Sequence, residues 1–290
     1  MTGMPVTKGP AMTHRPRRSA LYLPASNAKA IAKARTLPCD VVILDLEDAV
    51  APDAKAMARD QAVAAVNEGG FGPREIVVRV NALDTEWGAD DLAALHLCSP
   101  DAVLVPKVMH AGDVDHYARH MAATTPIWAM IETTASLFRL DTIAGAERLT
   151  ALVMGTNDLA KETGAQPGRD RLPFVGALGL AVAAARLHGR VILDGVFNGI
   201  DDDEGFSAQA RQAVEFGFDG KTLIHPRQID PCNAAFLPDA AELAWSRQII
   251  EAFDRPENQQ KGAIRVDGKM VERLHLHQAH RVIAAALQPG

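Results

Sequence analysis

The chain has 290 residues, of which 48% are hydrophobic, and these values predict one large globular domain of the α/β class with an extension. Its formal net charge of −6 at pH 7 argues against nucleic acid or an anionic membrane surface as the main partner. No apolar stretch is long enough to predict a membrane-spanning helix.

The three cysteines are widely separated and lack C-x-x-C spacing, which indicates neither a disulfide framework nor a structural zinc site. This cysteine usage fits a reducing compartment, and we expect a cytoplasmic protein. Residues 1–17 include a basic cluster but no apolar segment of the length that a secretory signal requires. We therefore predict a flexible N-terminal tail over residues 1–17.

Eight short apolar segments follow the tail at intervals of roughly 20–40 residues, which is the spacing of repeated β/α units. They cover residues 20–24, 41–48, 75–81, 102–108, 126–133, 149–158, 191–198 and 218–226. Eight such units predict a (β/α)8 TIM barrel over residues 18–235. A doubly wound open sheet is the structural alternative, but it would not bring all eight strand ends together.

The pattern changes in residues 236–290, which lie outside the eight units. Residues 239–253 predict an amphipathic helix, residues 254–262 a polar linker, and residues 264–287 a hairpin-like turn followed by a helix. We expect this C-terminal extension to act as a helical lid, either on its own barrel or on a neighbouring one.

Reactive side chains stand at the ends of the predicted strands, where a (β/α)8 barrel places its active site. The segment VVILDLEDAV is the clearest case, because a buried strand ends there in Asp45, Glu47 and Asp48. Carboxylates crowded in a partly dry site repel one another unless a cation lies nearby. The alternative is a strand that runs into a solvated acidic turn.

Glu132 and Asp158 each end an apolar segment, and we predict that they bind a metal ion. Two carboxylates, water and a chelating substrate are a common ligand set for Mg²⁺, which we expect as the cofactor. Glu47 and Asp48 would then orient water molecules on the ion. For Asp158 the alternative is a helix N-cap ahead of residues 159–163.

Arg79 points from a predicted strand towards this acidic centre, where a guanidinium would offset negative charge and bind a carboxylate or a developing oxyanion. A purely structural ion pair with Asp48 is the alternative. Lys107 either adds positive charge or pairs with Glu132.

Gly155, Thr156 and Asn157 precede Asp158 at a predicted helix start. Backbone N–H groups at such a position are not used within the helix and point at an incoming ligand. The segment is therefore expected to bind a substrate carboxylate.

Several spaced segments resemble the citrate lyase β-subunit-like family of the HpcH/HpaI aldolase superfamily, which includes malyl-CoA and citramalyl-CoA lyases. They are RRSALYLPASN, VVILDLEDAVAPDAKAMAR, VVRVNALDTEWGADDL, VLVPKV, IETTASL, MGTNDLA and GFDGKTLIHPRQI. The resemblance implies a (β/α)8 barrel, Mg²⁺ and a homotrimer, in some members stacked as a hexamer. It also implies that the C-terminal segment covers a neighbouring subunit's site.

The resemblance also implies roles for single residues. Glu132 and Asp158 match the family's metal ligands, and Arg79 matches its substrate-binding arginine. Glu47 and Asp48 match the acidic pair near the metal.

Tyr22, Lys33, Ile224 and His225 match positions that contact the CoA thioester in relatives with malyl-CoA activity. Two positions depart from those relatives. Asn27 replaces an arginine, and Glu272 stands where a lid aspartate performs proton transfer.

The resemblance predicts a Mg²⁺-dependent carbon–carbon lyase that acts on an acyl-CoA such as malyl-CoA, citramalyl-CoA or citryl-CoA. Retro-Claisen cleavage would give acetyl-CoA and a 2-oxo acid, with Arg79, Glu132, Asp158 and Glu272 as catalytic residues. A thioesterase acting on malyl-CoA-like compounds with the same site is one alternative. A citrate-lyase-complex subunit that acts on an acyl-carrier-protein thioester is the other.

Overall fold

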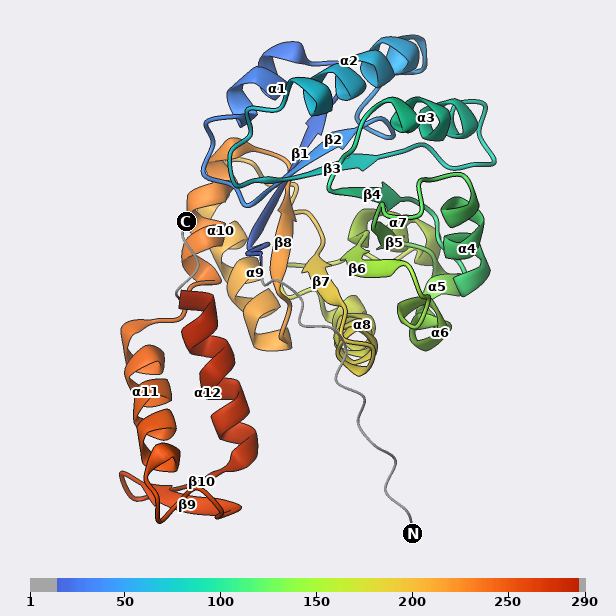
Figure 1. Cartoon of the computed structure of the whole chain (residues 1–290). Helices are drawn as coiled ribbons and strands as arrows, with labels where there is room; N and C mark the ends of the chain where they lie inside the picture. The colour runs from blue at the N-terminus through green and yellow to red at the C-terminus, as the bar shows by residue number, and fades with distance from the viewer. Residues whose placement is uncertain (1–14, 287–290) are drawn as a thin grey trace.

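The computed structural model of the chain describes residues 15–286, and eight parallel strands form a closed barrel at its centre (Figure 1). The strands are neighbours in chain order, from β1 to β8, and β8 pairs with β1 to close the barrel. The predicted (β/α)8 fold and all eight predicted strands are confirmed. The strands are β1 (Ser19–Pro24), β2 (Val41–Asp45), β3 (Glu75–Arg79), β4 (Ala102–Val105), β5 (Ile127–Ile131), β6 (Leu149–Met154), β7 (Val191–Asp194) and β8 (Gly220–Leu223).

Helices surround the barrel and connect each strand to the next. The α-helices are α1 (Ala28–Ala34), α2 (Lys55–Glu68), α3 (Gly88–Ala94), α4 (Ala111–Arg119), α5 (Thr134–Leu137), α6 (Leu140–Ala144), α7 (Thr156–Thr163), α8 (Val175–Leu187), α9 (Asp203–Phe216) and α10 (Ile229–Ala235). Short 3₁₀ turns lie at η1 (Pro52–Ala54), η2 (Leu95–Leu97), η3 (Leu172–Phe174) and η4 (Pro226–Gln228). No helix in residues 15–286 is long and apolar enough to span a membrane.

The strands are buried on both faces, and this explains why they are continuous apolar runs rather than alternating ones. Side chains on one face fill the barrel interior, among them Ile43, Leu104, Trp128 and Val153. Side chains on the other face pack against the helices in a separate, larger core. The two layers fix which residue of each strand points inward, and thus which polar residues reach the barrel mouth.

The N-terminal end of the barrel is covered by the segment that enters β1. Arg15 pairs with Asp101 at 2.9 Å, and Arg17 pairs with Glu75 at 2.5 Å. The Arg17 guanidinium also lies 5.3 Å from the ring centroid of Trp128 inside the barrel. Residues 15–17 of the predicted tail are therefore tied to the barrel, whereas residues 1–14 lie outside the described residues.

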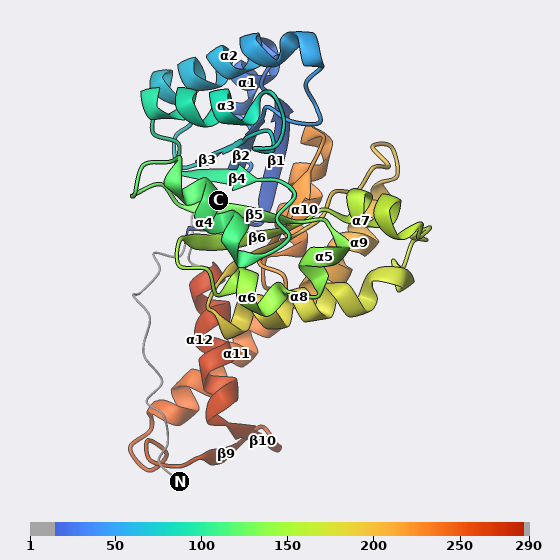
Figure 2. The same ribbon diagram turned by 90° about the vertical axis from the view of Figure 1, so that its right-hand side faces the viewer.

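The C-terminal unit, residues 240–286, forms a small core of its own and projects away from the barrel (Figures 1 and 2). It consists of α11 (Ala240–Asp254), an antiparallel hairpin of β9 (Ala263–Val266) and β10 (Lys269–Glu272), and α12 (Arg273–Ala286). The predicted helix, hairpin and final helix are thus confirmed. The hairpin lies at the far end of the unit, away from the barrel in both views.

A buried ion cluster joins β7 and β8 to the helices outside them. Asp194 accepts from Arg171 Nη1 at 2.7 Å and from Lys221 Nζ at 2.8 Å, and all three side chains are buried. Burial alone would raise the pKa of the Asp194 carboxyl, but Lys221 and Arg171 lower it below its ordinary value. Lys221 also donates to Gln209 of α9 at 2.8 Å, so the cluster is part of the fold.

Replacing Asp194 by Asn should destabilise the protein by about 3–5 kcal/mol, because it leaves two buried cations without their carboxylate. The free energy of unfolding is measured by urea denaturation followed by tryptophan fluorescence. The matched control is Asp201→Asn, which removes an exposed carboxylate paired with Arg227 at 3.3 Å and should change stability by about 1 kcal/mol or less. Equal effects of the two substitutions would contradict this account of the cluster.

Candidate active site

A cavity of about 270 Å³ opens at the carboxyl ends of the barrel strands. Its walls are contributed by residues from the ends of several strands and the loops that follow them. They include nine residues of the predicted site, namely Tyr22, Asp48, Arg79, Glu132, Gly155, Thr156, Asn157, Asp158 and Ile224. The structure thus brings the predicted metal ligands and the predicted substrate-binding arginine to one cavity.

Arg79 is held by Asp45 of the neighbouring strand. The two residues are register partners at the ends of β3 and β2, and the guanidinium binds both carboxylate oxygens at 2.7 Å. Asp45 also accepts from the backbone N–H groups of Glu47 at 2.9 Å and Ala49 at 3.2 Å. The sequence placed Asp45 among the crowded carboxylates but indicated no partner for it, whereas in the structure it fixes the arginine and the acidic turn together.

Glu47 and Asp48 complete the carboxylates around this guanidinium. Glu47 Oε2 lies 2.7 Å from Arg79 Nη1, and Asp48 Oδ2 lies 3.4 Å from the same nitrogen. The predicted alternative of an ion pair with Asp48 is thus a minor contact, and Asp45 is the main partner. Burial raises the pKa of Glu47 to about 8, and the nearby carboxylates add to the shift while Arg79 opposes it.

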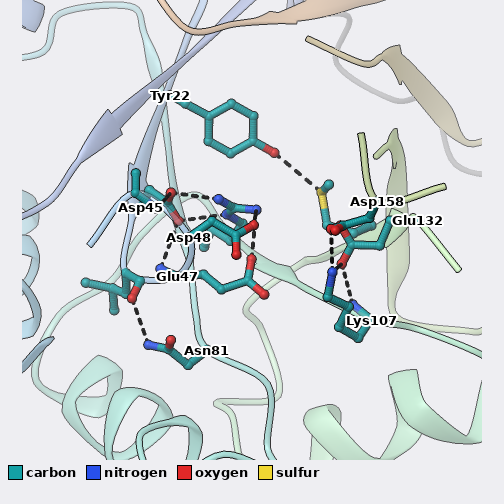
Figure 3. A network of polar contacts seen from close by, with 12 residues as sticks. Tyr22, Asp45, Glu47, Asp48, Asn81, Lys107, Glu132 and Asp158 are labelled. Atoms are coloured by element: carbon teal, nitrogen blue, oxygen red, sulfur yellow. Dashed lines mark hydrogen bonds and ion pairs between the residues drawn. The ribbon is translucent and has the colours of Figure 1, made fainter. Parts of the chain in front are cut away.

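Tyr22 supports the arginine from inside the barrel. The Arg79 guanidinium carbon lies 4.9 Å from the centroid of the Tyr22 ring, which is a cation–π contact. The Tyr22 hydroxyl donates to Met130 Sδ at 3.4 Å (Figure 3). Tyr22 therefore lines the cavity as the packing partner of the guanidinium.

Lys55 holds the turn that carries the acidic residues. Its buried ammonium donates to the carbonyl oxygens of Leu46 at 2.8 Å and Glu47 at 2.7 Å, and to Asn81 Oδ1 at 2.7 Å. The sequence alone did not indicate this residue, because its partners are backbone carbonyl oxygens that it reaches only through the packing of α2 on the turn. Lys55 fixes the backbone from which Glu47 and Asp48 project.

A second group consists of Glu132, Asp158 and Lys107 (Figure 3). Glu132 Oε1 accepts from the Lys107 backbone N–H at 2.7 Å and lies 3.4 Å from Lys107 Nζ, which also donates to Asp158 Oδ2. The proposed pairing of Lys107 with Glu132 is thus observed, with Asp158 as a further partner. Gly155 is the N-cap of α7 and Asp158 lies in its first turn, so the alternative of an Asp158 N-cap is wrong.

The cavity is surrounded by more carboxylates than cationic groups. Burial raises the pKa of Glu132 to about 7, and Asp158 adds to the shift while Lys107 opposes it. Such an excess of negative charge favours a divalent cation. The carboxylates are Asp45, Glu47, Asp48, Glu132 and Asp158, and the cationic groups are Arg79 and Lys107.

The residues present fit Mg²⁺. Oxygens of Glu132 and Asp158 converge on a single ammonium, so they converge equally well on one hard cation that prefers oxygen ligands. Gly155 leaves the room that Glu132 needs, since a Cβ there would lie 2.3 Å from Glu132 Cβ and 2.8 Å from Glu132 Oε2. Within residues 15–286, no three or more His, Cys, Asp or Glu side chains are grouped so that they could hold a metal ion.

The start of α7 offers hydrogen-bond donors next to these carboxylates. Its N-cap residue, Gly155, has no side chain that could accept hydrogen bonds from the first backbone N–H groups of the helix. These N–H groups are therefore available to an anion. Asn157 and Asn198 bond to each other through both amides, at 3.2 and 2.9 Å, and both line the cavity. This wall therefore suits a substrate carboxylate.

The remaining predicted site residues are spread more widely. Ile224 lines the cavity, whereas Lys33 is an exposed residue of α1 outside it and His225 caps the turn after β8. Glu272 ends β10 in the C-terminal unit, none of whose residues lines the cavity of its own barrel. Asn27 is the N-cap of α1 and accepts from the Ala30 N–H at 3.1 Å.

Comparisons with known proteins identify the family of this chain. The model of the HpcH/HpaI aldolase/citrate lyase family matches residues 18–226, which include every strand of the barrel. The chain belongs to this family. Relatives in it include a (3S)-malyl-CoA thioesterase of Cereibacter sphaeroides, 46% identical over 271 residues that cover 93% of this chain and 95% of the relative.

An L-malyl-CoA/beta-methylmalyl-CoA lyase of the same species is 33% identical over an alignment that is 309 residues long and covers 96% of this chain and 96% of the lyase. Among solved structures, the protein CitE of Mycobacterium tuberculosis in complex with magnesium, acetoacetate and coenzyme A aligns with a TM-score of 0.79. It is 32% identical, and the alignment covers 93% of this chain and 97% of that one. Magnesium is therefore bound in the family, and family members act on CoA thioesters.

Replacing Gly155 by Ala should weaken Mg²⁺ binding roughly tenfold or more, because the added methyl group displaces Glu132. The φ of Gly155 is −103°, so the effect is steric and not a backbone effect. Affinity is measured by isothermal titration calorimetry. The control is Gly176→Ala in α8, where a Cβ meets nothing within 4 Å. Unchanged affinity in Gly155→Ala would show that Glu132 does not need its present position.

Proposed function

We propose that this protein is a Mg²⁺-dependent enzyme that hydrolyses the thioester of a malyl-CoA-type substrate, giving free CoA and a hydroxy acid. One observation carries the proposal: Glu132 and Asp158 converge beside Arg79 in the cavity at the barrel mouth. Such a substrate carries a carboxylate and a hydroxyl that chelate a metal, and a thioester carbonyl within reach of the same cavity.

In this mechanism Glu132 and Asp158 hold the ion, which when bound supplies Lewis-acid polarisation of a substrate oxygen. The free N–H groups at the start of α7 bind the substrate carboxylate. Arg79 cannot turn away, because Asp45 and the Tyr22 ring hold it, and it stabilises negative charge on the thioester oxygen. Water attacks the carbonyl carbon and the C–S bond breaks. The CoA thiolate takes up a proton and leaves as the free thiol.

Glu47 and Asp48 are the carboxylates that orient the attacking water and accept its proton. Asp48 lines the cavity, and Glu47 stands behind it beside Arg79. The pKa of Glu47, raised to about 8 by burial, suits a group that exchanges a proton near neutral pH.

The relatives support hydrolysis ahead of the carbon–carbon cleavage expected from the sequence. Identity is 46% to the thioesterase and 33% to the lyase. Asn27, which departs from the lyase pattern, supports the same ranking. In the structure Asn27 caps α1.

Carbon–carbon lyase activity is the second candidate, and a specific feature favours it. Glu272 stands at the exposed end of the C-terminal unit, where it can protonate the enolate carbon after cleavage in a neighbouring subunit. The other alternative is a citrate-lyase-complex subunit that acts on an acyl-carrier-protein thioester. It is supported by the 31% identity to the Escherichia coli citrate lyase subunit beta. Turnover of CoA substrates by the purified chain alone would exclude a need for partner subunits.

The two chemistries are separated by their products. Purified protein is incubated with Mg²⁺ and malyl-CoA, citramalyl-CoA or citryl-CoA. A thiol reagent then measures free CoA, and a hydrazine measures the 2-oxo acid. Hydrolysis gives free thiol and no 2-oxo acid. Formation of a 2-oxo acid and acetyl-CoA in equal amounts, without free thiol, would replace this proposal by the lyase.

The Glu132→Gln variant should lose Mg²⁺ binding and at least about 100-fold of its turnover, since one of two ligands to the ion is removed. Calorimetry measures the first effect and the thiol assay the second. Glu204→Gln, at an exposed position of α9, is the matched control and should behave as the unmodified protein. Turnover by Glu132→Gln in metal-free buffer would contradict the mechanism.

We further propose a homotrimer, or a hexamer of two trimers, in which Glu272 reaches the neighbouring subunit's cavity and protonates the leaving group. The support is that the C-terminal unit stands off its own barrel and exposes Met270 and Leu274 beside Glu272. Exposed apolar side chains next to a carboxylate suit a segment that packs on a second copy.

If Glu272 acts in the neighbouring subunit, Glu272→Ala and Glu132→Gln should each be inactive alone and regain turnover when the two chains are co-expressed. Mixed oligomers then contain sites with an intact Glu132 from one chain and an intact Glu272 from the other. Tandem affinity tags isolate the mixed species, and light scattering gives its size. Inactive mixed oligomers would indicate that Glu272 acts in the site of its own subunit. Full activity of Glu272→Ala would show that Glu272 takes no part in the reaction.

A further inference from the structure

Lys107 has a strained backbone at the edge of the cavity. Its φ is 53°, and among residues 15–286 only Arg171 and Asp267 are other non-glycine residues with positive φ. A non-glycine residue in this region is strained, and the strain persists only where the surroundings impose it. Glycine would relieve the strain, so a lysine here indicates that its side chain has a role.

The strained turn directs two groups of Lys107 at the two metal-binding carboxylates. The backbone N–H donates to Glu132 Oε1 at 2.7 Å. The ammonium lies 3.4 Å from the same oxygen and donates to Asp158 Oδ2. One residue from the loop after β4 thus spans the acids that follow β5 and β6 (Figure 3).

The ammonium gives these carboxylates a counter-ion of their own. Glu132 is 1% exposed, and a buried carboxylate without a cation is strongly unfavourable. A divalent ion bound to both acids would use the oxygens that the ammonium now contacts. The Lys107 ammonium and the metal ion therefore compete for the same place.

Lys107 can leave without opening the barrel. Its side chain is 39% exposed, in contrast to the completely buried Lys221. Its ammonium is carried by a flexible chain with four methylene groups. The backbone N–H would stay on Glu132 while the ammonium moves.

We propose that Lys107 is a built-in counter-ion that holds Glu132 and Asp158 together until the metal ion binds, and that metal binding releases its ammonium to the rim of the cavity. The proposal rests on the metal site of the proposed function. It gives Lys107 two positions: on the acids before the metal binds, and free to pair with the anionic substrate afterwards. Lys107 is thus a positioning residue for metal and substrate.

The first test is the affinity for Mn²⁺, measured by electron paramagnetic resonance, in the unmodified protein and in Lys107→Met. Methionine has similar length, has no charge, and leaves the backbone N–H on Glu132. In Lys107→Met no ammonium competes with the metal ion for the oxygens of Glu132 and Asp158. Mn²⁺ should therefore bind at least roughly tenfold more tightly than to the unmodified protein. Weaker binding in Lys107→Met would mean that the lysine only shapes the ligands, and would overturn the proposal.

The matched control is Lys161→Met. Lys161 is an exposed residue of α7 whose charge acts on Asp158 without a hydrogen bond. It reports the general effect of removing one positive charge near the site. An equal gain in affinity in both variants would also overturn the proposal, because the gain would then be long-range electrostatics alone.

The second test uses the unmodified protein and needs no turnover. Reductive methylation at constant pH, followed by mass spectrometry, measures how accessible each lysine is with and without saturating Mg²⁺. Labelling of Lys107 should rise several-fold with Mg²⁺, whereas exposed Lys33 and buried Lys221 should not change. Labelling of Lys107 that is independent of Mg²⁺, in a protein that binds the ion by calorimetry, would refute the release. If no Mg²⁺ binds to either the unmodified protein or Lys107→Met, the proposed metal site itself fails.

Discussion

The negative charge at the barrel mouth is the constraint on which the rest of the site depends. Carboxylates at the end of β2, in the turn after it, directly after β5 and in α7 surround one cavity. Among the residues that pair with them, only Arg79 and Lys107 are cations. In a partly dry site such groups repel one another or take up protons, as the raised pKa values of Glu47 and Glu132 show. A divalent ion would resolve this repulsion, and through it the cavity would accept the anionic substrate of the proposed function.

The two cations differ in how firmly they are held. Arg79 is buried, makes two hydrogen bonds to Asp45 and rests on the Tyr22 ring, so it forms a fixed part of the site. Lys107 is partly exposed and reaches its acids through a flexible chain. The arginine therefore preorganises the site for charge on the substrate, while the lysine occupies a place that another cation can take.

Hydrolysis and carbon–carbon cleavage of a malyl-CoA-type thioester place the same demands on this barrel. Both need a chelated carboxylate and a stabilised thioester oxygen, which explains how relatives named for either reaction share the fold and so much sequence. The reactions differ in whether water enters and in where a proton is delivered. Under the proposed mechanism, the outcome depends on Glu47 and Asp48, which act on the water, and on what Glu272 contacts.

The sequence by itself indicated parallel strands covered on both faces, because it contains continuous apolar runs at regular spacing. It favoured a barrel over an open sheet because reactive residues follow these runs and only a barrel brings all eight strand ends together. It also determined that Glu132 and Asp158 meet, since residues that follow barrel strands share one mouth. Only the tertiary structure decided that Asp45, and not Asp48, is the main partner of Arg79, because that depends on the register of β2 against β3. The bridging position of Lys107 likewise depends on a backbone angle that no local pattern specifies, imposed by two carboxylates distant in the chain.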